Sequence, residues 1–131
     1  MIGVDTNVLV RLVVEDDPKQ ANLVEQFFAA LTTESPGFVS LATLVETVWT
    51  LRRTYKFDQP SISRFVYGLL GSRELVIQAP DVVRRATQDS MESKTDFSDA
   101  IIAHLGIDAD CDYTVTFDQR AAALPGMRLL A

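Results

Sequence analysis

The chain has 131 residues and a mass of 14.5 kDa, so we predict one domain over residues 1–131 that buries its own core. The formal net charge of −6 and the pI near 4.6 argue against a protein that holds nucleic acid by a broad basic surface. The single cysteine excludes an internal disulfide, and no charge-free apolar run reaches the length of a membrane span. Asp5 and Arg11 interrupt the first apolar stretch, so we expect no signal peptide and no membrane partner, and a cytoplasmic location.

Short strand patterns alternate with longer helical patterns along the chain, which predicts an α/β fold with a parallel sheet. The first half is predicted to contain strand Ile2–Val4, a helix over Val8–Val13, a helix from Pro18 to about Thr33, strand Gly37–Ser40, and helices Leu41–Tyr55 and Ser61–Leu70. The second half is predicted to contain strand Leu75–Ile77, a helix opened by Asp81 and reaching about Met91, helix Phe97–Leu105, strand Tyr113–Phe117, a short alanine-rich helix and strand Met127–Leu130.

Two of these strands, at opposite ends of the chain, lead directly into an aspartate. Asp5 follows the first strand, and Asp118 follows Tyr113–Phe117. If both strands lie parallel in one sheet, both carboxylates emerge at its carboxyl edge, where open α/β folds bind ligands and where two carboxylates favour a hard cation such as Mg²⁺. Asp is also a favoured helix N-cap, so for each residue alone capping and metal binding remain comparable alternatives.

Further acidic residues lie where they could join such a site. Glu46 is in the second turn of the helix after the second strand, and it points away from the apolar stripe of that helix, so a solvent-facing glutamate is its simplest interpretation. Asp96 and Asp99 are three residues apart at a helix start and would share one face. A solvated face, with Asp96 as a cap, remains the alternative there.

Other catalytic options are few. His104, the only histidine, falls at the edge of an apolar helical face and is predicted to be a packed structural residue. Cys111 lies between two aspartates, which disfavour the thiolate that a nucleophile requires. The basic residues are expected to form a solvated face more often than to contact phosphate. They are a local group, Arg52, Arg53 and Lys56, and two arginines that each follow a candidate acidic position, Arg11 and Arg120. The acids together are what a metal-dependent phosphodiesterase requires.

Four stretches of the chain, in order, resemble the PIN domain, specifically the VapC-type toxins. They are Val4–Leu9, Leu44–Val48, Asp96–Ala103 and Thr114–Asp118. The resemblance implies a PIN-like three-layer fold, with a five-stranded parallel sheet flanked by helices. It also implies a Mg²⁺- or Mn²⁺-dependent ribonuclease that cleaves single-stranded RNA, the toxin of a type II toxin–antitoxin pair, with a cognate antitoxin that occludes the site. A homodimer is expected.

The resemblance also assigns roles to individual residues. Asp5, Glu46, Asp99 and Asp118 match the four acidic positions of the family. Asn7 matches a polar residue that helps to orient the first aspartate and a metal-bound water, and Thr116 matches a hydroxyl near the site. Asp96 matches an extra acid found in some members, either as a metal ligand or in support of one.

Two functions of other classes remain alternatives. A receiver-like Mg²⁺-binding phosphoacceptor domain is also α/β, acidic and of similar length, but it needs an aspartate at a mid-chain strand end. Here the second and third strands run into Ser40-Leu41 and Gln78-Ala79. The other alternative, a catalytically silent partner-binding module, does not require the full set of acids.

Overall fold

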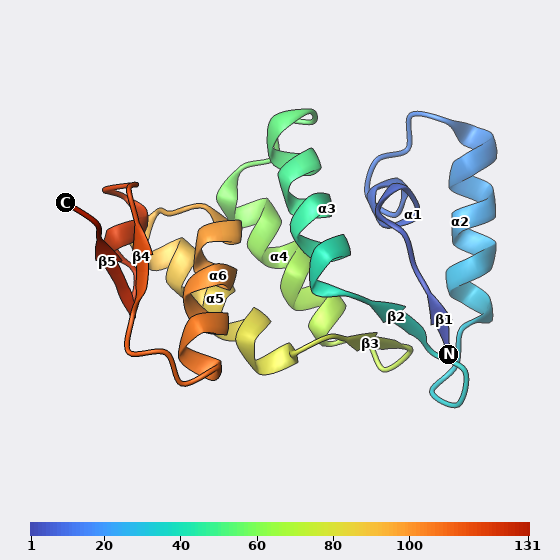
Figure 1. Cartoon of the computed structure of the whole chain (residues 1–131). Coiled ribbons are helices and arrows are strands. Elements are labelled where there is room, and N and C mark those ends of the chain that lie inside the picture. The colour runs from blue at the N-terminus through green and yellow to red at the C-terminus, as the bar shows by residue number, and fades with distance from the viewer. The chain divides into compact units, whose positions relative to one another are not determined.

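The computed structural model describes every residue, Met1–Ala131, and forms two compact units, Met1–Gln78 and Ala79–Ala131 (Figure 1). Each unit combines helices with a small parallel sheet, which confirms the predicted α/β class. None of the helices has the length and apolar character that crossing a membrane requires.

The first unit contains a three-stranded parallel sheet and four helices. Its strands are β1 (Ile2–Gly3), β2 (Gly37–Val39) and β3 (Leu75–Ile77), in the order β1-β2-β3. Ile2 pairs with Gly37, and Gly37 pairs in turn with Leu75. The helices are α1 (Thr6–Arg11), α2 (Pro18–Ala30), α3 (Leu41–Arg53) and α4 (Gln59–Leu70). The strands are joined only through helices, as parallel pairing requires.

Side-chain caps fix where the helices of the first unit begin. The Asp17 carboxylate accepts hydrogen bonds from the backbone N–H groups of Lys19 and Gln20, and Pro18 occupies the first turn of α2. Ser40 caps α3, and Asp58 caps α4. Each cap satisfies N–H groups that have no partner inside the helix, which stabilises a helix by roughly 1 kcal/mol.

Apolar residues of both helices and strands form the buried core of the first unit. Gly37 lies at a point of close approach, because a Cβ atom there would be 3.0 Å from the Leu31 side chain and 3.2 Å from that of Val4. The core consists of Val4, Leu9, Val10, Val24, Leu31, Val39, Leu44, Val48, Leu51, Ile62, Val66, Leu69 and Ile77.

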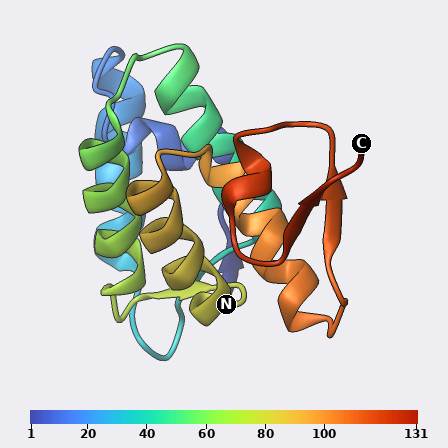
Figure 2. The same cartoon turned by 90° about the vertical axis from the view of Figure 1, so that its left-hand side faces the viewer.

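The second unit contains the helices α5 (Pro80–Ser93) and α6 (Phe97–Asp108), which pack together, and a two-stranded parallel sheet. The strands β4 (Thr114–Thr116) and β5 (Met127–Leu129) pair in register, joined through the short 3-10 helix η1 (Ala121–Ala123) (Figure 2). Gly126 precedes β5 with φ of +73°, a conformation that favours glycine, and a Cβ atom there would lie 2.9 Å from Ile107.

The structure corrects the predicted sheet. A single five-stranded parallel sheet was expected, whereas the five strands form one sheet of three and one of two. The strands that precede Asp5 and Asp118 therefore belong to different sheets. Local sequence patterns indicate strands, but they do not determine which strands pair across long separations in the chain.

Three helix starts also differ from the prediction. α1 begins at Thr6 rather than Val8, because Asp5 caps it. α4 begins at Gln59 rather than Ser61, because Asp58 caps it. α5 begins at Pro80, so Asp81 lies in its first turn and is not its cap. The residue in the cap position, Ala79, has a left-handed backbone conformation and offers no side-chain hydrogen bond.

Candidate functional site: two groups of carboxylates

Asp5 stands at the end of β1, as predicted. The backbone N–H of Val4 donates to the Phe38 carbonyl at 2.9 Å, so pairing with β2 extends to the residue before Asp5. Asp5 is the N-cap of α1, and its Oδ1 accepts a hydrogen bond from the Thr6 backbone N–H at 2.8 Å. The capping alternative therefore holds, but it occupies one carboxylate oxygen. Oδ2 remains available to bind a cation.

Glu46 is exposed on α3, as periodicity predicted, yet its carboxylate is held in place. The Thr6 hydroxyl donates a short hydrogen bond to Glu46 Oε1, joining residues 40 positions apart. Thr6 directly follows Asp5, so this hydrogen bond links the start of α1 to Glu46 on α3. The two helices also pack against each other. The sequence alone did not assign a role to Thr6, although its position between Asp5 and Asn7 is a signal that could have indicated one.

Asn7 and Thr116, the two predicted supporting residues, behave differently. Asn7 is exposed, and its side chain makes no hydrogen bond to another residue. The Thr116 hydroxyl oxygen accepts a hydrogen bond from the Asp118 backbone N–H at 3.0 Å. Thr116 therefore fixes the turn that carries Asp118, which is a positional role.

Asp118 caps the turn that follows β4. Its Oδ1 accepts hydrogen bonds from the backbone N–H groups of Arg120 at 2.8 Å and of Ala121 at 3.3 Å. As at Asp5, one oxygen satisfies backbone donors and Oδ2 remains without a hydrogen-bond partner. At both strand ends capping and cation binding are therefore compatible functions of the same carboxylate.

Asp99 is an acid whose surroundings disfavour its charged form. It lies in the first turn of α6 and is partly buried. This burial raises the pKa of Asp99 above its ordinary value, and the negative charges of Asp96 and Asp118 raise the pKa further. Asp96 occupies the N-cap position of α6, but its side chain makes no capping hydrogen bond. The predicted cap function of Asp96 is thus positional only, and its carboxylate contributes charge.

None of the five candidate acids forms an ion pair. Asp96, Asp99 and Asp118 interact electrostatically within the second unit, whereas Asp5 and Glu46 belong to the first. No three His, Cys, Asp or Glu side chains of the structure are grouped so that they could hold a metal ion. The prediction that all five acids serve one metal site therefore stays a prediction. Uncompensated negative charge around a partly buried carboxylate does fit a hard cation.

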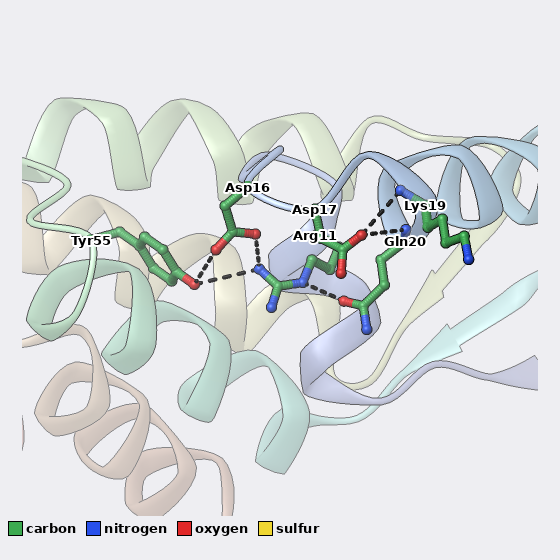
Figure 3. Close-up of polar contacts among 6 residues, drawn as sticks. All are labelled: Arg11, Asp16, Asp17, Lys19, Gln20 and Tyr55. Atoms are coloured by element: carbon green, nitrogen blue, oxygen red, sulfur yellow. Dashed lines mark hydrogen bonds and ion pairs between the residues drawn. The ribbon is translucent and has the colours of Figure 1, made fainter.

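Arg11, which follows the first acidic motif, is committed to structure (Figure 3). Its guanidinium donates a short hydrogen bond to Asp16 and further hydrogen bonds to Gln20 at 2.8 Å and to the Tyr55 hydroxyl at 3.4 Å. Tyr55 in turn donates to Asp16. Figure 3 shows these side chains converging from α1, α2 and the end of α3. Arg11 therefore ties three segments of the chain together.

The basic group after α3 is different. Arg52, Arg53 and Lys56 are exposed, and none of them forms an ion pair. Arg52 donates a hydrogen bond to the Phe57 carbonyl at 3.2 Å. These side chains are therefore positive charges open to a partner.

His104 is structural, as predicted. It is buried at 8% exposure, and its Nε2 forms a hydrogen-bonded pair with Oδ2 of Asp89 on α5. Cys111 is free and exposed. Neither residue interacts with a candidate acid, so the carboxylates remain the main chemical groups of the chain.

A comparison with models of protein families supplies the family. The model of the PIN domain matches residues 2–127, a range that includes every candidate residue described above. The comparison with curated proteins gave no match. Domains of this kind are generally metal-dependent nucleases. The chain therefore belongs to the PIN domain family.

Proposed function

We propose that this protein is a Mg²⁺- or Mn²⁺-dependent endoribonuclease that cleaves single-stranded RNA in the cytoplasm and acts as the toxin of a toxin–antitoxin pair. The observation that carries the proposal is the environment of Asp99, a partly buried carboxylate near two other carboxylates. Burial and two neighbouring carboxylates disfavour its charged form, and no basic side chain compensates it. A divalent cation is the group that relieves such a cluster, and PIN domains are generally metal-dependent nucleases.

In this proposal Asp5, Glu46, Asp99 and Asp118 are the metal ligands and catalytic residues, with Asp96 as a further ligand or a support. These residues would hold the cation, which would supply charge neutralisation and an activated water for phosphodiester hydrolysis. Hydrogen bonds within the chain hold two of these carboxylates in place. Thr6 fixes the Glu46 carboxylate, and Thr116 fixes the turn that carries Asp118. Asn7 is an exposed polar residue close to Asp5 in the chain. Capping bonds hold one oxygen each of Asp5 and Asp118.

Metal-dependent cleavage is the direct test. The purified protein should cleave a labelled single-stranded oligoribonucleotide in Mg²⁺ or Mn²⁺, and excess EDTA should abolish cleavage. Asp5→Asn should abolish it as well, since an amide binds a hard cation poorly. Asp17→Asn is the matched control, because Asp17 also caps a helix but belongs to no motif, so its variant should cleave normally.

The outcomes separate the alternatives. Cleavage that persists undiminished in excess EDTA contradicts the metal mechanism. A folded protein that cleaves no RNA with either metal supports the silent partner-binding module instead. The receiver alternative has no phosphoacceptor in this structure, because the residue after β3 is Gln78, whose side chain accepts a hydrogen bond from the Leu41 backbone N–H at 2.9 Å.

The same charges support the toxin function. A site of uncompensated carboxylates should attract an Arg or Lys of an antitoxin, which would block the cation or the substrate phosphate. Co-expression with the antitoxin, sought as a short reading frame next to this gene, should yield a complex that cleaves RNA at least about 100-fold more slowly than the free protein, a loss of roughly 2.7 kcal/mol. The mass of the free protein in solution would test the expected homodimer. Failure to form a complex, or a complex of unchanged activity, contradicts the toxin function and leaves the nuclease function standing.

A further inference from the structure

The exposed face of α3 carries an aromatic side chain close to Glu46. Trp49, the only tryptophan of the chain, is 56% exposed and lies three residues after Glu46. Arg53 lies four residues further along the same helix. Residues at these spacings share one side of a helix, while Leu44, Val48 and Leu51 face the core. The rise of a helix places Arg53 roughly 10 Å along the axis from Glu46.

Trp49 and Arg53 form a cation–π pair on the outer side of α3. The guanidinium carbon of Arg53 lies 5.6 Å from the centroid of the Trp49 ring. No carboxylate pairs with Arg53, and exposed Arg52 and Lys56 add positive charge at the same end of the helix. In a chain of net charge −6, this is a local concentration of positive charge beside an exposed aromatic side chain.

We propose that Trp49 stacks on a nucleobase of the RNA substrate and that Arg53 binds an adjacent phosphate, so that α3 positions the strand next to Glu46. The inference rests on the proposed ribonuclease function and assigns positioning residues for it. Single-stranded nucleic acid is recognised by aromatic side chains on which bases stack, combined with basic groups that follow the backbone. The outer face of α3 offers both, and Arg53 over the ring provides a cation–π contact besides. A second copy of the chain or an antitoxin covering Trp49 is the competing occupant.

Tryptophan fluorescence tests the inference without requiring cleavage. Because Trp49 is the only tryptophan, its emission reports this position alone. In the Asp99→Asn variant, chosen to remain uncleaving, a single-stranded oligoribonucleotide should quench the emission in a saturable manner. An oligomer of the same length with abasic riboses should bind more weakly and should not quench. Quenching that is absent, or equal for both oligomers, overturns the stacking assignment.

Substitutions then test each residue. Trp49→Ala should weaken RNA binding by about 5-fold to 100-fold and raise KM with little change in kcat, whereas Trp49→Phe should recover part of the affinity. Arg53→Ala should reduce the slope of log affinity against log salt by about 0.7, as the loss of one phosphate contact predicts for a single strand. The exposed residues Tyr67 and Arg73 provide the controls, and Tyr67→Ala and Arg73→Ala should bind RNA normally.

The outcomes distinguish this inference from the proposed function. Normal cleavage by the parent with unchanged KM in Trp49→Ala overturns the inference and leaves the nuclease in place. RNA-specific quenching in a protein that never cleaves supports the inference and contradicts the nuclease. If iodide cannot quench Trp49 in the free protein while Trp49→Ala turns a dimer into a monomer, a second copy covers the ring, and the inference is overturned.

Discussion

Replacing Asp99 by asparagine should abolish RNA cleavage and at the same time raise the melting temperature of the metal-free protein at neutral pH by a few degrees. The loss of cleavage should be at least about 100-fold, because a metal ligand supplies several kcal/mol of transition-state stabilisation. The gain in stability should follow from removing a charge that is partly buried beside Asp96 and Asp118. A favourable interaction with the N-terminus of α6, about 0.3–1 kcal/mol, opposes part of this gain.

The stability that Asp99→Asn gains over the parent should increase with pH. Folding raises the pKa of Asp99, because burial and the charges of Asp96 and Asp118 disfavour its anion. The folded protein therefore holds the proton more tightly than the unfolded chain does, and Asp99 destabilises the fold increasingly as pH rises through the interval between the two pKa values. Below that interval Asp99 is protonated in both states, and the Asp99→Asn variant should have little advantage. Above it the advantage should be constant.

Thermal melts with and without Mg²⁺ measure both effects. Mg²⁺ should stabilise the parent, less so at acidic pH where it competes with the Asp99 proton, and it should stabilise Asp99→Asn little. Asp81→Asn is the control, because Asp81 also lies in the first turn of a helix but pairs with Arg84 at 3.0 Å, so this variant should not become more stable. A large drop in the melting temperature of Asp99→Asn would show that the carboxylate is structural.

The second large expected effect is a loss of stability when His104 is replaced by alanine. His104→Ala removes a buried ring and leaves Asp89 on α5 without its partner, so the free energy of unfolding should fall by roughly 2–4 kcal/mol. Cleavage measured well below the melting temperature should change less than about 3-fold, since a loss beyond that would need more than roughly 0.7 kcal/mol of transition-state stabilisation from this residue. Chemical denaturation and single-turnover cleavage measure the two quantities.

Asp89→Asn provides the comparison for this pair. Asparagine can keep a hydrogen bond to His104, so it should lose less stability than His104→Ala. A folded His104→Ala variant that has lost cleavage more than about 100-fold, a loss of roughly 2.7 kcal/mol, would make the histidine part of the reaction. The carboxylates alone would then be an incomplete account of catalysis.

Sequence patterns predicted the strands of this fold well and their assembly poorly. Leu75–Ile77 was predicted to the residue, because a short apolar run with Pro80 close behind it has few other interpretations. The start of α5 was misplaced, because the sequence pattern favours Asp81 as its cap, although Pro80 occupies the first turn and the cap position belongs to Ala79. The division into two sheets was missed, since strand pairing depends on contacts between distant segments.

At the candidate site, too, local sequence predicted the positions of single residues but not the contacts between distant ones. The positions of Asp5 and Asp118 after strands were predictable from local sequence, and so was the exposure of Glu46. The hydrogen bond from Thr6 to Glu46 was not, because it joins two helices whose packing no local pattern encodes. Burial, the largest cause of the raised pKa of Asp99, likewise depends on the fold around α6 and could not be predicted from the sequence. The contribution of Asp96, three residues away on the same helix face, could be.

The ribosome synthesises the first unit, Met1–Gln78, before the second, Ala79–Ala131. All pairings among β1, β2 and β3 lie within Met1–Gln78, so this sheet can form on the ribosome before the residues of α6 and β4 have been translated. Under the proposed chemistry, a nascent chain that already displays Asp5 and Glu46 still lacks Asp99 and Asp118. The incomplete chain would then not cleave the RNA of its own ribosome or its own messenger RNA until translation is nearly finished.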